Sequence, residues 1–444
     1  MKKFFQSLYL SPRLFLALAI NVELFINAYF LPPAFIFAIG ALGLTVTAFL
    51  VDLAVLYRVQ KGIVARRNTP EKLSNGDENE ITLELENYYN FTIKTEIFDE
   101  LPFQFQKRDT SFQAKVSSGA LQELKYTIRP TKRGEYEFGA VKVYAKTPLG
   151  LVSRRFVFEQ GKTLPVYPSY MQMRQYEIMA MSNRLQDIGV KRIRKLGHSM
   201  EFEQIRDYVV GDDLRTLNWK ATARSGRYMV NQYTEEKSQP IYCVIDKGRM
   251  MKMPFKGLSL LDYAINATLV MSNIAIYKQD RAGLITFAEE MGVVLKAKRN
   301  ATQMQAITEI LYNQKTRYLE SDFELLYTNI RRQINHRSLM LIFTNFDSLS
   351  AMHRQLPYLR RLNKDHLLVV IFFENTELQE LILAPANTTE EVYLKTVAEK
   401  FAFEKRQIVR ELNLHGIQSI LTAPENLTVN TLNKYLELKA RGVI

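Results

Sequence analysis

Two long apolar runs open the chain. Residues 14–30 read LFLALAINVELFINAYF, residues 34–57 read AFIFAIGALGLTVTAFLVDLAVLY, and Pro32 and Pro33 lie between them. A helix needs about 20 mostly apolar residues to cross a bilayer, and a proline pair suits a tight turn. The pattern therefore predicts a transmembrane helical hairpin over residues 1–61, with spans at about 14–31 and 34–57.

Period-two alternation replaces these runs after residue 62. Segments that begin at Ile81, Phe91, Leu124 and Glu135 alternate apolar and polar residues, with Gly, Pro and Asn between them. Short alternating strands about ten residues apart are typical of an antiparallel sandwich. We expect a small β-sandwich over residues 62–165 that acts as a spacer or docking module.

Apolar strand patterns alternate with helical patterns over residues 241–444. Buried strands that alternate with helices predict a doubly wound parallel α/β sheet. Ligands bind such sheets at the carboxyl ends of the strands. The predicted strands cover residues 241–246, 282–288, 291–297, 338–346, 367–373 and 416–423. The predicted helices cover residues 259–277, 301–313, 321–335, 390–413 and 427–440.

A charge-rich stretch precedes this unit, inside a segment, residues 166–240, that we interpret as a linker. The turn Gly211–Asp213 predicts a helix N-cap, followed by a helix over residues 214–224. Acids and bases nearly balance, which favours an ion-pair network between domains or a partner-docking surface over a nucleic-acid groove. The candidate residues are Glu201, Arg206, Asp212, Asp213, Arg215, Trp219, Lys220 and Arg224.

Composition and charge narrow the class of protein. The chain has 444 residues, of which 47% are hydrophobic and 24% charged, as in ordinary globular proteins. The single cysteine, Cys243, excludes a disulfide framework and a cysteine-based zinc site. The net charge of +13 alone suggests a membrane surface or nucleic acid. Residues 1–67 and 160–198 each hold seven basic and two acidic residues, so each segment contributes +5 to the net charge. Ten of the thirteen excess charges therefore lie near the predicted hairpin or in the link to the α/β unit, which indicates membrane topology and contact with anionic lipids.

The charges around the hairpin predict its orientation. Basic residues stand on both outer flanks and none stands in the turn. The positive-inside rule then places both termini in the cytoplasm and the chain in the cytoplasmic inner membrane. Polar residues interrupt the spans, among them Glu23, Asn27 and Asp52. For such residues we expect hydrogen bonds between helices, within the hairpin or in an oligomer, rather than an ion pathway.

Known catalytic and nucleotide-binding signatures are missing from the sequence. It has no Gly-x-x-x-x-Gly-Lys-Ser/Thr loop, no Gly-x-Gly-x-x-Gly after the first predicted α/β strand, no Gly-x-Ser-x-Gly elbow, and five scattered histidines. We therefore expect no enzyme and no bound nucleic acid. Two alternatives stay open: a metal-assisted hydrolase using Asp212, Asp213 and Asp246, and membrane-surface nucleic-acid binding through residues 191–195.

The charged stretch resembles the signature of the domain-of-unknown-function-58 family. That resemblance implies a bacterial membrane protein with a von Willebrand factor A-like domain. It also implies partners, a MoxR-type AAA+ ATPase and other von Willebrand A proteins, in chaperone-like or complex-assembly work. The matching residues are Gly197, Glu201, Phe202, Arg206, Tyr208, Gly211, Asp212, Asp213, Arg215, Asn218, Trp219, Lys220, Ala223 and Arg224.

The same resemblance allows the metal site of von Willebrand A domains to be checked residue by residue. Asp246 is retained, but Gly248 and Met250 stand where the first loop usually has two serines. Ser321 is the candidate for the second-loop hydroxyl, and Asn345 stands at the third-loop aspartate position. Because Mg²⁺ needs several oxygen ligands, we expect no tight Mg²⁺ or Mn²⁺ site and expect Asp246 to pair with a nearby base.

Overall fold

The structure is a computed structural model, and it describes residues 2–106, 111–181, 200–235, 238–386 and 388–443. The chain divides into two compact units, Met1–Tyr167 and Pro168–Ile444. The first unit contains both apolar runs together with the β-rich segment. The second contains the charged stretch and the α/β sheet.

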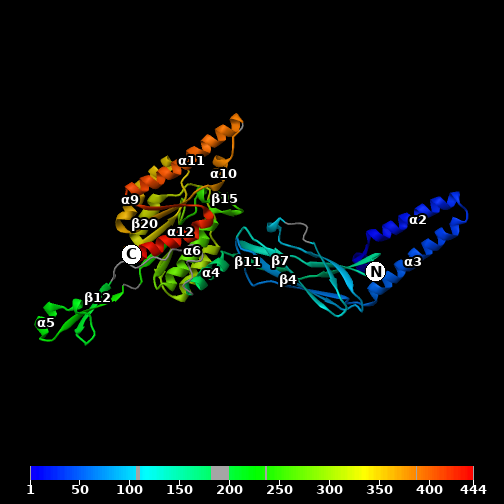
Figure 1. Ribbon diagram of the computed structural model, residues 1–444, viewed down its shortest axis with the longest axis horizontal. Helices are drawn as coiled ribbons and strands as arrows, with labels where there is room; N and C mark the ends of the chain where they lie inside the picture. The colour runs from blue at the N-terminus through cyan, green and yellow to red at the C-terminus, as the bar shows by residue number, and fades with distance from the viewer. Residues whose placement is uncertain (1, 107–110, 182–199, 236–237, 387, 444) are drawn as a thin grey trace. The chain divides into compact units, whose positions relative to one another are not determined.

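The first unit begins with a helical hairpin (Figure 1). Helix α1 (Lys2–Ser7) and strand β1 (Leu8–Leu10) precede helices α2 (Pro12–Phe30) and α3 (Ala34–Arg58). Both α2 and α3 are long and apolar enough to cross a membrane, which confirms the predicted pair of candidate spans. Between them, the side chain of Asn21 donates to Thr45 Oγ1 over 2.8 Å. A third apolar helix, α6 (Leu260–Tyr277), lies buried in the second unit.

Three small sheets make up the segment for which the alternation predicted a β-sandwich. Their strand orders are β1-β10-β9-β5-β6, β3-β11-β8 and β2-β4-β7. Because the inward-facing residues alternate with exposed ones, each strand contributes one apolar row to the core. The strands are β2 (Ile63–Asn68), β3 (Leu73–Ser74), β4 (Asn79–Asn87), β5 (Ile93–Asp99), β6 (Ser111–Val116), β7 (Leu121–Ile128), β8 (Gly134–Phe138), β9 (Val141–Lys146), β10 (Val152–Phe158) and β11 (Lys162–Tyr167).

The segment that we interpreted as a linker contains regular structure in its described residues. Helix α4 (Tyr170–Met181) packs on α6 through Tyr176 and Ala180. Strands β12 (Met200–Asp207) and β13 (Met229–Glu235) form an antiparallel pair. The predicted helix over residues 214–224 is instead a short 3₁₀ turn, Leu214–Thr216, followed by helix α5 (Trp219–Ser225). The break arises because Asn218 starts a new helix by accepting a hydrogen bond from the Ala221 amide at 3.0 Å.

The α/β sheet has the order β18-β17-β14-β19-β20-β21. Strand β18 pairs antiparallel with β17, so the sheet is mixed and not wholly parallel as predicted. Its strands are β14 (Pro240–Asp246), β17 (Arg281–Phe287), β18 (Met291–Lys298), β19 (Leu339–Phe343), β20 (Leu367–Phe373) and β21 (Gln418–Thr422). Short strands β15 (Pro254–Phe255) and β16 (Leu258–Ser259) form a separate pair.

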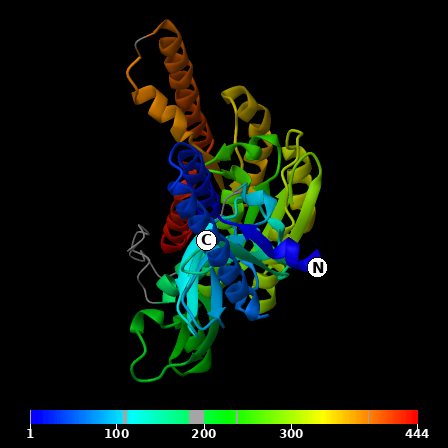
Figure 2. The same cartoon turned by 90° about the vertical axis from the view of Figure 1, so that its right-hand side faces the viewer.

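Helices cover both faces of this sheet, which carries two buried apolar clusters. Besides α6, they are α7 (Ala301–Tyr312), α8 (Phe323–Gln333), α9 (Leu349–Asp365), α10 (Thr376–Leu383), α11 (Thr389–Leu414) and α12 (Leu427–Ala440). Helices α10 and α11 pack on each other and extend beyond the sheet in both views (Figures 1 and 2). The end of this helical pair carries exposed apolar side chains, Leu383, Val392 and Tyr393.

Candidate functional site

The carboxyl ends of β14 and β19 flank the point where the strand order reverses direction, where ligands bind in α/β sheets. Asp246 ends β14 and is 3% exposed. Its carboxylate accepts hydrogen bonds from Thr344 Oγ1 at 2.6 Å, from the Gly248 amide at 2.8 Å and from Ser321 Oγ. Burial raises the pKa of Asp246, and these three donors oppose the rise. The structure thus pairs Asp246 with hydroxyls and not with the base we predicted.

Asn345 has a different partner. Its Oδ1 accepts a hydrogen bond from Lys405 Nζ at 2.5 Å, and the same ammonium donates to the Phe346 carbonyl at 2.5 Å. Burial lowers the pKa of Lys405 to about 8, and nearby Asp347 opposes that shift. Asp246, Ser321 and Asn345 therefore line one small cavity, but only the first two share a hydrogen bond.

Thr344 and Lys405 are the residues that sequence reasoning missed. Thr344 stands directly before Asn345, where an apolar strand ends. Its position at the carboxyl end of that strand was the signal that could have identified it as a site residue. Lys405 lies one helical turn before Ile408 and Val409, on the face of α11 that packs into the core. A lysine on an apolar helix face is the pattern that identifies a buried cation.

The donor set at Asp246 does not fit Mg²⁺ or Mn²⁺. One carboxylate and two hydroxyls supply four oxygens, and both hydroxyls already donate to the carboxylate. A side-chain Cβ at Gly248 would lie 2.1 Å from Ser321 Oγ, so Ser321 fills the space that a first-loop serine would need. The cavity volume is about 50 Å³, which holds only one or two waters, whereas Mg²⁺ keeps several.

The pKa of Asp246 gives a testable pH dependence. Because the folded-state pKa is raised, the ionised form opposes folding, and stability should fall as the pH rises through that pKa. Asp246→Asn removes the charge, and its Nδ2 can donate to Thr344 Oγ1. We expect the melting temperature of Asp246→Asn to exceed that of the wild type at pH 8 but not at pH 4. Asp246→Ala, which leaves three donors unpaired, should cost about 3 kcal/mol or more at pH 4 and less at pH 8, where the wild type itself is destabilised by the buried charge. Mg²⁺ binding by calorimetry that disappears in Asp246→Asn would contradict this assignment.

The charged signature makes its own local contacts. Arg206 donates twice to Asp212, at 2.8 and 2.6 Å, which lowers the pKa of that carboxylate. Asp213 instead caps the following turn at the Arg215 amide, 3.0 Å away. Trp219, Lys220 and Arg224 lie on α5 and are exposed. Among the described residues, no hydrogen bond joins Asp212 or Asp213 to Asp246. The side chain of Glu201 and the basic run 191–195 lie outside the described part.

The polar residues of the hairpin do not share one site. Asn27 donates to the Glu23 carbonyl of its own helix at 3.1 Å. Asp52 is fully buried, and its carboxylate accepts hydrogen bonds from the amides of Leu151 and Val152, each at 2.9 Å, and from Thr147 Oγ1. Asp52 therefore joins α3 to the turn between β9 and β10.

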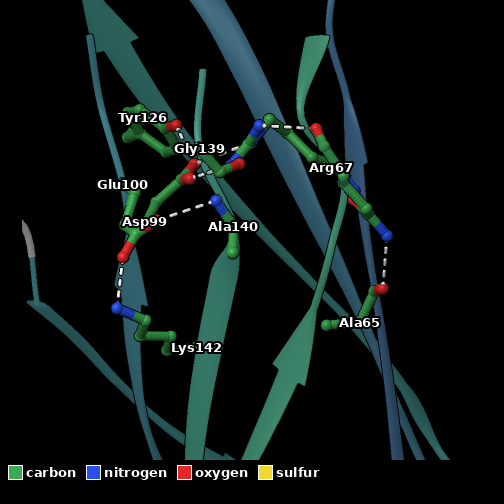
Figure 3. Close-up of polar contacts among 9 residues, drawn as sticks. Ala65, Arg67, Asp99, Glu100, Tyr126, Gly139, Ala140 and Lys142 are labelled. Atoms are coloured by element: carbon green, nitrogen blue, oxygen red, sulfur yellow. Dashed lines mark hydrogen bonds and ion pairs between the residues drawn. The ribbon is translucent and has the colours of Figure 1, made fainter. Parts of the chain in front are cut away.

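A buried ion pair lies in the β-rich part of the same unit (Figure 3). Arg67 and Asp99 pair with side chains 2% and 0% exposed. Arg67 also donates to the Gly139 carbonyl at 3.0 Å and to the Gln160 carbonyl at 3.2 Å, while Tyr126 donates to Asp99. Burial, with Asp99 beside it, raises the pKa of Tyr126. Since every charge has a protein partner, the cluster is a structural connection among five strands and loops.

The chain is similar to several known proteins. It is 10% identical to the solved structure of BatB, a conserved hypothetical protein from Bacteroides thetaiotaomicron, covering 46% of this chain and 98% of that one with a TM-score of 0.29. It is 11% identical to proximal thread matrix protein 1 of the mussel byssus, covering 45% of each chain with a TM-score of 0.26.

A curated relative matches part of the chain. The uncharacterized protein YeaD of Bacillus subtilis is 29% identical over 126 residues, which is 28% of this chain and 31% of YeaD. The match thus spans about a third of that relative. Residues 204–407 match the family model described as a protein of unknown function, DUF58. This match confirms, over that range, the family resemblance that we predicted from the signature.

Proposed function

We propose that the chain is a non-enzymatic, membrane-anchored interaction protein. Its α/β unit would bind a MoxR-type AAA+ ATPase, together with other von Willebrand A proteins, in complex assembly. The observation that carries the proposal is an apolar groove at the carboxyl ends of β19 and β20. Its volume is about 310 Å³, and Met253, Phe255, Phe373, Leu378, Phe401 and Lys405 line it.

Exposed apolar residues continue from this strand-end groove onto the α10–α11 pair. Leu378 and Phe401, which line the groove, belong to α10 and α11. Leu383, beyond them, is 84% exposed, and Tyr393 is also exposed. Large contiguous apolar surface on a folded unit marks a site for another molecule. A groove next to protruding aromatic and aliphatic anchors suits a protein surface better than a small ligand.

The topology supports a von Willebrand A-like architecture. Counted along the chain, the six strands of the sheet have the order 3-2-1-4-5-6, with the third strand antiparallel at one edge. The partners of Asp246 support a role without metal, because hydroxyls saturate its carboxylate. The separate local partners of Asp212 and Asp213 argue against the hydrolase alternative, which needs carboxylates at one site.

Membrane anchoring rests on the two candidate spans and on their flanking charge. With basic residues at both ends of the hairpin, the positive-inside rule favours cytoplasmic termini and an inner-membrane location. The α/β unit would then face the cytoplasm, where an AAA+ ATPase has its nucleotide.

Site-specific photo-crosslinking tests the proposed docking face. A crosslinker at Leu383 or Phe401 of the full-length chain, expressed in its host, should capture an AAA+ ATPase that mass spectrometry identifies. The same crosslinker at Val293, an exposed apolar position on edge strand β18, is the matched control and should not. Equal capture of the ATPase at Val293, or none at Leu383 and Phe401, would refute docking at the strand-end groove.

A further inference from the structure

Three lysines form a row across the five-stranded sheet of the first unit. Lys94 on β5 lies directly opposite Lys146 on β9 and Lys115 on β6. Like charges directly opposite each other on one sheet face are destabilising. Lys146 forms an ion pair with Glu96, with 3.3 Å between Nζ and the carboxylate oxygen. Among the described residues, neither Lys94 nor Lys115 has an ion-pair partner. The row therefore carries a repulsion that an anion would relieve.

The row lines a pocket of about 560 Å³ that also includes Ser11 and Arg13. This volume is typical of small-molecule sites. Four cationic side chains and one carboxylate, Glu96, face the pocket, so its lining has an excess of positive charge. Arg13 is held in place by a hydrogen bond from Nη1 to the Leu149 carbonyl at 3.2 Å.

The pocket lies where the candidate spans leave the apolar layer. Ser11 immediately precedes α2, and its amide donates to the Leu151 carbonyl at 3.1 Å. Helix α3 rises about 27 Å between Ala34 and Asp52, close to the roughly 30 Å of a hydrocarbon core. With Ala34 at the far edge of the apolar layer, Asp52 and the amides of Leu151 and Val152 that it bonds would lie at headgroup level, and so would the turn beside the pocket.

We propose that this pocket binds the phosphate of an anionic phospholipid from the adjacent leaflet. The lysine row and Arg13 would neutralise the headgroup, while the acyl chains stay beside α2 in the bilayer. Lipid binding would hold the sheet at a fixed height on the membrane surface. The inference is independent of the proposed protein partner, since it concerns only residues of the first unit.

Native mass spectrometry of the full-length chain in neutral detergent tests this proposal. Phosphatidylglycerol should bind more tightly than phosphatidylcholine with the same acyl chains. Lys94→Gln/Lys115→Gln should weaken phosphatidylglycerol binding roughly 30-fold, because each cation at an anionic surface contributes about a factor of five. Lys125→Gln/Lys132→Gln removes the same charge elsewhere in the unit and should change the affinity less than twofold.

A thermal melt separates this role from a structural one. In neutral detergent, Lys94→Gln/Lys115→Gln should melt higher than the wild type because the repulsion is gone, which also shows that the variant folds. Phosphatidylglycerol should raise the melting temperature of the wild type and not of the variant. Equal phosphatidylglycerol affinity in wild type and variant would overturn the site. If glycerol 3-phosphate raises the melting temperature of the wild type as much as phosphatidylglycerol does, the ligand is a free phosphate compound and not a lipid.

Discussion

Asp99→Asn should speed amide hydrogen exchange in strands β2 and β5 by roughly 10²- to 10³-fold. The substitution keeps the shape of the side chain but leaves the Arg67 guanidinium buried without an opposing charge. Breaking a buried pair by removing one partner costs about 3–5 kcal/mol, and each 1.4 kcal/mol is a factor of ten. Hydrogen exchange of the full-length chain in detergent reports the β-rich part separately from the α/β unit.

Two comparisons make this expectation specific. Lys125 and Glu80 form an ion pair on the same unit with both side chains 58% exposed. Glu80→Gln should therefore change exchange less than about fivefold, because exposed pairs contribute at most about 1 kcal/mol. Replacing the whole cluster by apolar residues, as Arg67→Met/Asp99→Leu/Tyr126→Phe, should cost less than Asp99→Asn alone. If Asp99→Asn exchanges like the wild type, the buried pair does not stabilise this part of the fold.

Local sequence patterns were sufficient for most elements of the fold. Apolar runs of 17 and 24 residues identified the two candidate spans, since few soluble structures need such runs. Alternation identified β4, β5 and β7, and apolar runs identified β14 and β20. The antiparallel edge strand could also have been predicted: only Ala288, Glu289 and Glu290 separate β17 from β18, and a parallel connection needs a dozen or more residues.

The contacts that matter for the sites could not be read from local patterns. The lysine row depends on strand register, because shifting one strand by a single residue would turn its lysine to the other face. Lys405 meets Asn345 across 60 residues of sequence. Asp52 meets its three donors across 95 to 100 residues. Its position within an apolar run favoured a partner inside the membrane, whereas its donors belong to a β-turn.

Asp52→Ala should loosen the junction between the hairpin and the β-rich part of the first unit. The substitution removes the acceptor for the amides of Leu151 and Val152 and for the Thr147 hydroxyl. An unsatisfied buried donor costs about 1–3 kcal/mol, so three of them should cost at least 3 kcal/mol. We expect the exchange of the Leu151 and Val152 amides to accelerate at least 100-fold.

The remaining contacts at this junction determine how firmly the hairpin stays attached to the β-rich part in Asp52→Ala. Arg154 donates to the carbonyls of Leu56 and Val59, each at 2.7 Å, and to that of Gln60 at 3.0 Å. Tyr89 donates to the Leu56 carbonyl at 2.9 Å. These bonds satisfy carbonyls at the end of α3 that have no partner within the helix. Asp52→Ala should therefore loosen the turn between β9 and β10 first, while Asp52→Ala/Arg154→Ala should also weaken the attachment of the hairpin, which the Tyr89–Leu56 bond and the β1–β10 pairing still hold.

Spin-label distances distinguish a loosened turn from a loosened hairpin. Cys243 is buried and burial raises the pKa of its thiol to about 12, so cysteines introduced at Tyr29 and Leu121, both exposed, should take the labels selectively. The distance distribution should stay narrow in the wild type, widen modestly in Asp52→Ala and widen further in the double variant. Thr47→Val, which removes a hydroxyl that donates to the Gly43 carbonyl of its own helix, should match the wild type. A broad distribution in the wild type would mean that Asp52 does not couple the span to the sheet, and the lysine pocket would then have no fixed height at the membrane.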